Sequence, residues 1–87
     1  MTDNQRAIGR AKVLRESIRE TLLQRRQDLG LTQREVAERM DTTQAHISSV
    51  ERRGTNDISL IMRFAAVLDL DYRALLDGTV EVAEVVY

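Results

Sequence analysis

Apolar and polar residues alternate with a helical period along most of this chain, and the clearest pattern lies in its middle. Thr32 and Glu35 have the spacing of a capping box, in which each side chain bonds the backbone amide of the other residue. Behind them, Val36, Ala37 and Met40 fall on one helical face. The pattern therefore predicts a short helix that follows Thr32 and turns its apolar face inward.

A second short helix is predicted directly after the first. The helical pattern breaks at residues 41–42, and Thr43 is a residue type that often caps a helix N-terminus. Ile47 and Val50 then form an inward stripe, and Gly54 is suited to end the helix. Because so few residues separate the two helices, they must cross at a steep angle, as in a helix-turn-helix motif.

The outward face of the second helix carries side chains that suit a DNA major groove. At roughly 100° per residue, the side chains pointing away from the inward stripe are small, hydroxyl-bearing, amide or basic. They are Gln44 at the helix start, Ala45, Ser49 and Arg52 on the outer side, and His46, Ser48 and Arg53 on the flanks. Glutamine can bond adenine through two hydrogen bonds, hydroxyls can bond either base edge, and an alanine methyl can meet that of thymine. The alternative is an ordinary solvated face, but the capped helix and turn in front of it favour DNA.

A longer part of the sequence resembles a known family. The matching segments are QRRQDLGLTQREVAERM, TTQAHISSVERRG and ISLIMRFAAVLDLDYRALL, between Ser17 and Leu76. They resemble the small helix-turn-helix domain of phage repressors, Cro proteins and the wider Xre-type transcriptional regulators. The resemblance implies an all-α, five-helix repressor-like domain that binds DNA.

The resemblance also implies roles for individual residues. In the family, a glutamine at the position of Gln33 contacts a phosphate and braces the glutamine at the position of Gln44. The further base-reading positions of the family correspond to Ala45 and Ser49, and Thr43 corresponds to a backbone contact.

The loop after the second helix approaches a phosphate in the family. Arg52, Arg53, Thr55 and Asn56 are the candidates for that contact here, whereas Asp57 would be repelled by the phosphate.

Two residues depart from the family pattern. Asp41 in the turn and Asp69 after the fourth helix stand where the family usually has glycine. Aspartate tolerates a left-handed backbone better than most residues. We therefore expect both turns to survive at some cost in stability.

Two charged residues fall on faces that should be buried. Arg26 lies on the apolar stripe of Ile18, Leu22 and Leu29, and Glu51 shares the inward face of the second short helix. An unpaired guanidinium in an apolar seam would carry a desolvation penalty of several kcal/mol. A structural ion pair between the two residues is therefore expected, and the family has a salt bridge at these positions. In the alternative, the arginine head reaches water along the helix edge.

The chain divides into three predicted parts: a basic N-terminal helical extension (1–16), the helix-turn-helix domain (17–77) and a C-terminal tail (78–87). The extension has its apolar residues at helical spacing and Asp3 or Asn4 as a cap; it carries Arg6, Arg10, Lys12 and Arg15. Ser17 with Glu20 is another capping box, which predicts that a helix starts or is reinforced there. Three interpretations remain open: continuity with the next helix, a separate packing helix, or a mobile arm along the DNA backbone.

The last two helices and the tail follow from capping and composition. Asp57 or Ser59 should cap a largely buried helix, and Asp71 a short final one. The tail TVEVAEVVY is rich in valine and follows a turn signal, so it predicts a β-strand. This strand either frays or pairs with the same strand of a second copy, as in some antitoxins of the family.

Composition narrows the chemistry further. The 87 residues contain no cysteine and one histidine, which argues against thiolate metal sites, cofactors and a catalytic triad. His46 has no partner close in sequence, so it is a DNA contact or a solvated residue rather than a general base. No apolar run is long enough for a membrane span, which makes the cytoplasm the expected location.

The net charge of −1 hides an uneven distribution. Residues 1–54 have eleven basic and eight acidic residues, or +3, whereas residues 55–87 have two and six, or −4. A basic front and an acidic back are typical of a protein that presents one surface to DNA. We therefore expect a non-enzymatic, sequence-specific DNA-binding regulator that acts as a homodimer. The alternative is an antitoxin or other interaction module whose main partner is a protein such as a toxin, favoured by the negative net charge.

Overall fold

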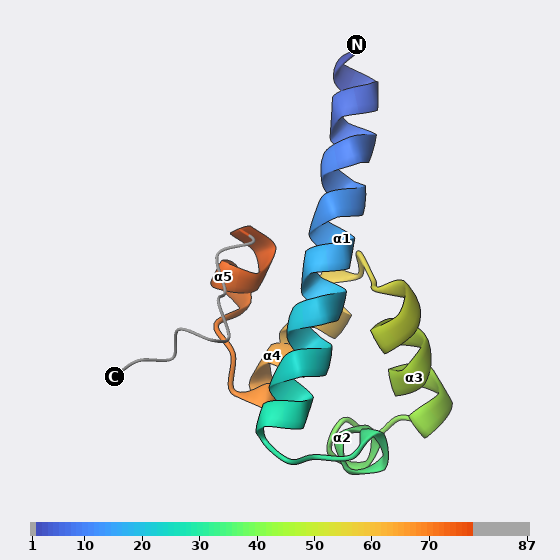
Figure 1. Cartoon of the computed structure of the whole chain (residues 1–87), viewed down its shortest axis with the longest axis vertical. Coiled ribbons are helices and arrows are strands. Elements are labelled where there is room, and N and C mark those ends of the chain that lie inside the picture. The colour runs from blue at the N-terminus through green and yellow to red at the C-terminus, as the bar shows by residue number, and fades with distance from the viewer. Residues whose placement is uncertain (1, 78–87) are drawn as a thin grey trace.

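The computed structural model describes residues 2–77 of the chain. These residues form five helices: α1 (Asp3–Asp28), α2 (Gln33–Arg39), α3 (Gln44–Arg53), α4 (Ile58–Leu68) and α5 (Tyr72–Asp77) (Figure 1). The other four helices surround the C-terminal half of α1, and the N-terminal half of α1 extends beyond them (Figure 1). The expected all-α class with a repressor-like set of five helices is confirmed.

The first helix is continuous from the extension into the domain. It begins after Thr2, whose side chain forms a capping box with Gln5, so the predicted caps at Asp3 or Asn4 are wrong. The helix also passes through Ser17 without a new start. Continuing an existing helix adds a hydrogen bond per residue fixed, whereas a new start would require a new nucleus, so propagation prevails over the local capping signal. Of the three interpretations of the extension, continuity with the next helix is correct.

One apolar core holds the five helices together. Its largest fully buried side chain is Phe64 of α4, and the predicted inward residues of α2 and α3 are buried with it. The members of this core are Ile18, Leu22, Val36, Ala37, Met40, Ile47, Val50, Leu60, Ile61, Phe64, Ala65, Leu68 and Leu75. The N-caps of α2, α3 and α4 are Thr32, Thr43 and Asp57, so the alternative cap Ser59 is not used.

Two arginines bind backbone carbonyls at the ends of neighbouring helices. The Arg25 Nε donates to the Leu68 carbonyl over 2.9 Å, at the end of α4. The Arg63 guanidinium donates to the Met40 carbonyl, at the end of α2. Since the last carbonyls of a helix have no partner within it, these bonds satisfy them and fix the relative positions of the helices. Both arginines therefore serve the fold.

The two aspartates that replace family glycines adopt the left-handed backbone, as expected. Asp41 and Asp69 both have φ of 54°, at the turn after α2 and at the end of α4. The amide of Asp69 still donates to the Ala65 carbonyl, so the end of α4 remains capped.

The predicted C-terminal strand lies outside the residues that the structure describes. Within residues 2–77, none of the helices combines the length and the apolar character that a membrane span requires.

Candidate nucleic-acid interface

The first short helix and the turn after it position the second. The Thr32 hydroxyl accepts from the Glu35 amide over 3.0 Å, and the Glu35 carboxylate accepts from the Thr32 amide over 3.0 Å, which confirms the predicted capping box. In the turn, the Thr42 amide donates to the Ala37 carbonyl over 2.9 Å. The Thr43 hydroxyl then accepts from the His46 amide in the first turn of α3, over 3.1 Å. These local bonds set the angle at which α3 leaves α2.

These hydrogen bonds also act on the charge of the capping carboxylate. The Thr32 backbone amide and then the Thr32 hydroxyl hold the pKa of Glu35 below its usual value of 4.5. Both bonds favour the ionised carboxylate, which also suits the positive end of the α2 dipole.

A charged network beneath the interface joins the first three helices. Arg26 Nε of α1 donates to Glu51 Oε2 of α3 over 2.6 Å, and Arg26 Nη2 donates to Oε1 over 3.0 Å. The expected ion pair is therefore present, and its two-pronged geometry is that of a strong Arg–carboxylate pair. The third guanidinium nitrogen, Arg26 Nη1, donates to the Leu31 carbonyl over 2.8 Å. The structure describes no buried side-chain nitrogen or oxygen that lacks a hydrogen-bond partner.

The same network binds the side chain of Gln33 at the start of α2. Gln33 Nε2 donates to Glu51 Oε1 over 3.0 Å. Among the described residues this amide is not bonded to Gln44, which differs from the bracing that the family resemblance implies. The buried carboxylate of Glu51 has unfilled acceptor positions beside Arg26, and the nearby amide fills one of them.

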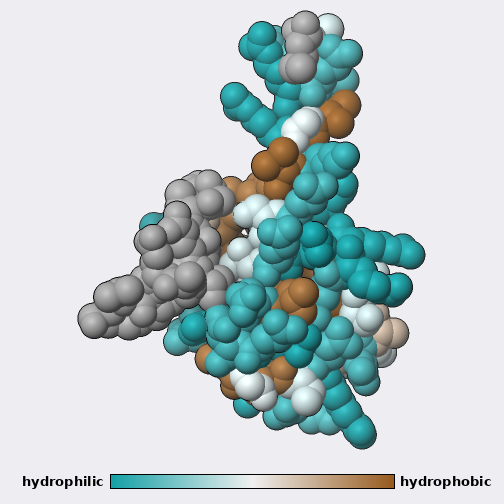
Figure 2. Space-filling model, viewed as in Figure 1, coloured by the Kyte–Doolittle hydropathy of each residue, from teal (hydrophilic) through white to brown (hydrophobic). Residues whose placement is uncertain are grey.

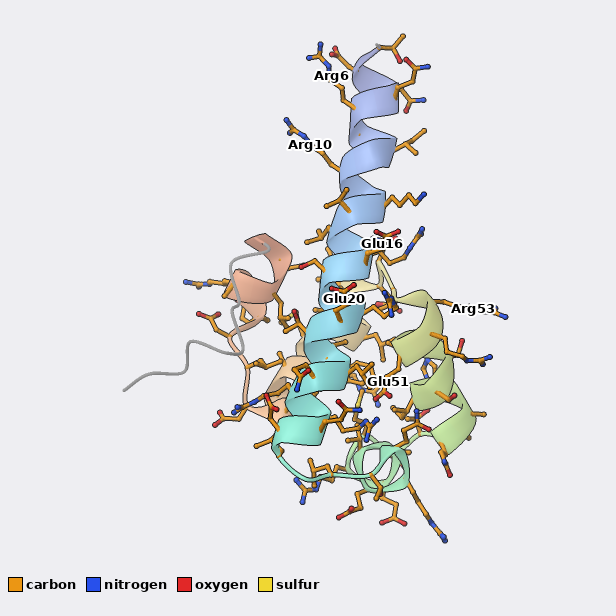
Figure 3. All side chains as sticks on the ribbon, viewed as in Figure 1. Arg6, Arg10, Glu16, Glu20, Glu51 and Arg53 are labelled. Carbon is orange, nitrogen blue, oxygen red and sulfur yellow. The ribbon has the colours of Figure 1, made fainter. Side chains whose placement is uncertain are left out.

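The outward side of α3 is exposed at both ends of the helix and half-buried in its middle. Glu51, Ile47 and Val50 are buried on the inner side, and Arg53 points away from α1 in Figure 3. The predicted outward residues are exposed at Gln44, Ala45, His46, Arg52 and Arg53, half-buried at Ser48 and Ser49, and preceded by the exposed cap Thr43. In Figure 2 the surface around α3, at the right edge of the molecule, is mostly teal or white, so polar and weakly polar residues dominate it. The face is therefore accessible in the way that a groove-binding helix requires.

The ring of His46 is held by a residue in the turn. His46 Nδ1 lies 2.9 Å from the Thr42 hydroxyl, so the expectation that this histidine has no nearby partner is wrong. Thr42 lies in the turn before α3, and His46 lies in the first turn of α3. A threonine hydroxyl does not activate a general base as a carboxylate does, so the contact holds the ring in place without making it a base.

The loop after α3 packs closely against α1. Gly54 has φ of 74°, and a Cβ there would lie 2.5 Å from Arg15 Cγ and 2.7 Å from the Arg15 carbonyl oxygen. Asn56 Oδ1 accepts from Arg15 Nη1 over 3.4 Å, and Asn56 Nδ2 donates to the Ala11 carbonyl over 3.4 Å. These contacts bring Arg15 beside the loop, although 41 residues separate it from Asn56.

Two of the predicted phosphate-binding loop residues are therefore already engaged within the chain. Asn56 bonds α1, and the Thr55 hydroxyl accepts from the Asp57 amide over 3.0 Å. The Arg15 guanidinium is a cation at this loop that sequence reasoning assigned only to the extension. No sequence signal could have placed it there, because the contact depends on how the loop crosses α1.

Two other arginines of the extension lie elsewhere. Arg6 and Arg10 point to the side of α1 opposite α3 (Figure 3). They therefore lie on a different side of the molecule from the exposed face of α3. Within residues 2–77, no group of three or more histidine, aspartate or glutamate residues is placed to hold a metal ion.

Comparison with known proteins places this arrangement in a family. The family model for the helix-turn-helix matches residues 22–75, which is more than half of the chain and includes α2, α3 and α4 entirely. No curated protein and no solved structure gives a significant match to the chain. The matched region contains the turn, the buried ion-pair glutamate and the exposed face of α3. The chain belongs to the Cro/C1-type, or Xre, helix-turn-helix family of DNA-binding transcriptional regulators.

Proposed function

We infer that this regulator is a repressor or autoregulator that binds a palindromic operator as a homodimer and reads its bases with α3. The observation that carries the proposal is the exposed face of α3, held outward by a buried ion pair and a capped partner helix. Its side chains offer an amide, hydroxyls, a methyl and an imidazole within one helical face, and these groups suit base edges.

The residues of the interface divide into base readers and phosphate contacts. Gln44, Ala45 and Ser49 are the proposed base readers, because they occupy the exposed end and outer side of α3. Arg52 and Arg53 in the last turn of α3 are the proposed phosphate contacts, because both are exposed and long enough to reach the backbone.

Further proposed contacts come from flanking residues. Gln33 uses one N–H of its side-chain amide on Glu51, so its second N–H remains for a phosphate at the start of α2. Thr43, His46 and Ser48 border the base readers on α3. Thr55 and Asn56 are weaker candidates, since both already bond within the chain.

A dimer follows from the small size of one recognition helix. One short helix reads only a few base pairs, so a specific operator needs two half-sites about 34 Å apart. Ile58 and Met62 lie one turn apart on α4 and are 57% and 44% exposed, and Tyr72 of α5 is 36% exposed. These apolar side chains support a contact with a second copy on the α4–α5 side.

Selection of bound fragments from a random pool of DNA duplexes tests the proposal. It should return one symmetric motif with two half-sites about one helical turn apart. A pool that shows no enrichment after repeated rounds, with a folded protein, would refute the proposed reading of DNA. A single asymmetric half-site would refute the homodimer while leaving the base-reading face intact.

A second candidate function is an antitoxin or other module whose main partner is a protein. The net charge of −4 over residues 55–87 favours it, because an acidic surface suits a partner other than DNA. A gel shift on the DNA upstream of its own gene, with and without the neighbouring gene product, separates the two. DNA binding by the chain alone supports the regulator, and a shift that requires the second protein supports the module.

A further inference from the structure

The N-terminal half of α1 has little to pack against in the part of the chain that the structure describes. It extends beyond the other helices (Figure 1), and every residue from Asp3 to Val13 is exposed. Among the described residues, the stretch from Asp3 to Val13 makes one hydrogen bond to a distant part of the chain, in which Asn56 donates to the Ala11 carbonyl. A helix of this length is marginal in water by itself, and Gly9 lowers its stability further relative to alanine. An additional contact would therefore stabilise this half.

One face of this half combines two arginines with an apolar residue. Arg6, Arg10 and Val13 recur at helical spacing and so share a side of α1, which we call the arginine face. Val13 is 67% exposed. Within residues 2–77, neither of these arginine side chains makes a hydrogen bond or an ion pair. Both point to the side of α1 on which α5 lies (Figure 3).

The chain itself supplies an acidic and apolar segment directly after α5 in the sequence. α5 packs against α1, and its last residue, Asp77, is followed by ten residues that include four valines. These ten residues carry Glu81 and Glu84 and no basic residue, or −2, whereas residues 3–13 carry three basic residues and one acidic residue, or +2. The charges are complementary.

The length of the segment permits the contact. Ten residues span up to about 33 Å when extended, whereas the α1 residues from Asp3 to Val13 span about 16 Å of helix. The helix that precedes the segment, α5, packs against α1, so the segment needs to use only part of its extended length. Attachment to the same chain gives it an effective concentration in the millimolar range, which favours a contact within one chain over a contact between copies.

We propose that residues 79–87 bind the arginine face of α1 in the same chain. Glu81 and Glu84 pair with Arg6 and Arg10, and valine side chains of the segment cover Val13. The contact stabilises the projecting half of α1. It also holds the two carboxylates on the side of α1 away from α3, where they do not repel DNA.

Paramagnetic broadening in the full-length chain tests this contact. The chain has no cysteine, so Ala83→Cys provides a single attachment site for a nitroxide. In an isotopically labelled chain carrying the nitroxide, the backbone amide signals of residues 6–13 should lose most of their intensity, and reduction of the nitroxide should restore it. Intact signals would overturn the proposal.

A mixed sample identifies the source of the segment. Isotopically labelled chain without the cysteine is combined with unlabelled chain that carries the nitroxide. The proposal predicts no broadening of residues 6–13 in this mixture. Broadening as strong as in the first sample would place the segment on a second copy and would overturn the contact within one chain.

Charge reversal tests the chemistry of the contact. Arg6→Glu with Arg10→Glu should abolish the broadening, and adding Glu81→Lys with Glu84→Lys should restore it. Glutamates near a helix N-terminus are compatible with the helix, and the core amide signals report that the domain remains folded. The matched control, Arg34→Glu with Arg53→Glu, changes two exposed arginines on α2 and α3 and should leave the broadening unchanged. Broadening that persists in the Arg6 and Arg10 variant would overturn the ionic pairing.

Discussion

At the scale of single residues, the Arg26–Glu51 pair determines whether α3 stays in place. The Glu51 side chain is 6% exposed and that of Arg26 13%, so both charges have been removed from water. Each of the two charges stabilises the fold only while the other is present, because either charge alone would be buried without a partner.

We predict that Arg26→Ala or Glu51→Ala lowers the free energy of unfolding by about 3–5 kcal/mol. The double replacement Arg26→Met with Glu51→Leu should cost much less, because it strands no charge. Chemical denaturation of the three variants measures both effects. Single variants that lose less than the double variant would contradict this account of the pair.

The capping carboxylate makes a pH-dependent contribution at the same scale. The pKa of Glu35 is lowered in the folded state, so its stabilising effect is fully present above the unfolded pKa near 4.5 and is lost as pH falls through the folded pKa. We predict that the wild type loses stability relative to Glu35→Gln as pH drops below 4.5, because glutamine keeps an acceptor but does not titrate. Urea denaturation of both proteins between pH 6 and pH 3 measures the difference. A difference that does not change with pH would exclude this role for the carboxylate.

At the scale of elements, the loop between α3 and α4 depends on a glycine. Gly54 combines a positive φ with a close approach to the backbone of Arg15 on α1. Any side chain at this position meets both obstacles, so the loop must either shift away from α1 or bear the strain.

We predict that Gly54→Ala destabilises the domain by about 1–3 kcal/mol or more, the cost of a strained backbone plus the contact. The matched control is Gly9→Ala, where a Cβ would meet nothing within 4 Å and the helix should gain up to about 1 kcal/mol. Thermal denaturation compares the two. Similar effects of the two substitutions would argue against a special role for Gly54.

In the proposed function, the end of α3 provides the electrostatic part of DNA binding. We predict that Arg52→Ala and Arg53→Ala each weaken binding to all duplexes and reduce the slope of log K against log salt by about 1. The control is Arg73→Ala on α5, whose guanidinium lies over the Tyr72 ring, 5.9 Å from its centroid. DNA titrations over a range of salt concentrations measure the slopes. Slopes that match the wild type would remove these arginines from the phosphate contact.

Much of the element structure could be predicted from the sequence because its signals are local. The Thr32–Glu35 box and the inward stripes of α2 and α3 depend on residues three or four apart, and helical geometry fixes how such residues lie. The Arg26–Glu51 pair was predictable for a different reason. Each residue puts a charge on an otherwise apolar face, and each supplies the opposite charge that the other needs.

The remainder depended on contacts between distant segments. The Arg15–Asn56 bond joins residues that no sequence period relates, and the approach of the loop to α1 creates it. Ser17 and Glu20 have the spacing of a capping box, but α1 continues through both residues, so no helix starts there. Gln33 bonds Glu51 because the buried carboxylate can accept further hydrogen bonds beside Arg26. The sequence alone does not show that the Gln33 amide lies within reach of that carboxylate.

At the scale of the whole molecule, the two ends of α1 serve different purposes. Its C-terminal half supports the helix-turn-helix from behind, through the buried ion pair and the core. Its N-terminal half projects away and turns Arg6 and Arg10 to the side opposite α3 (Figure 3). The face of α3 proposed to bind DNA and the arginine face proposed to bind residues 79–87 thus lie on opposite sides of α1.

The central claim is that the exposed face of α3 reads DNA bases, and the Gln44→Ala variant tests it most directly. Fluorescence anisotropy titrations compare this variant with the wild type on the selected operator and on a scrambled duplex of the same composition. Binding to the operator should weaken by about 1–3 kcal/mol, while binding to the scrambled duplex should hardly change. Equal losses on both duplexes, or no loss on the operator, would contradict the reading of bases by α3.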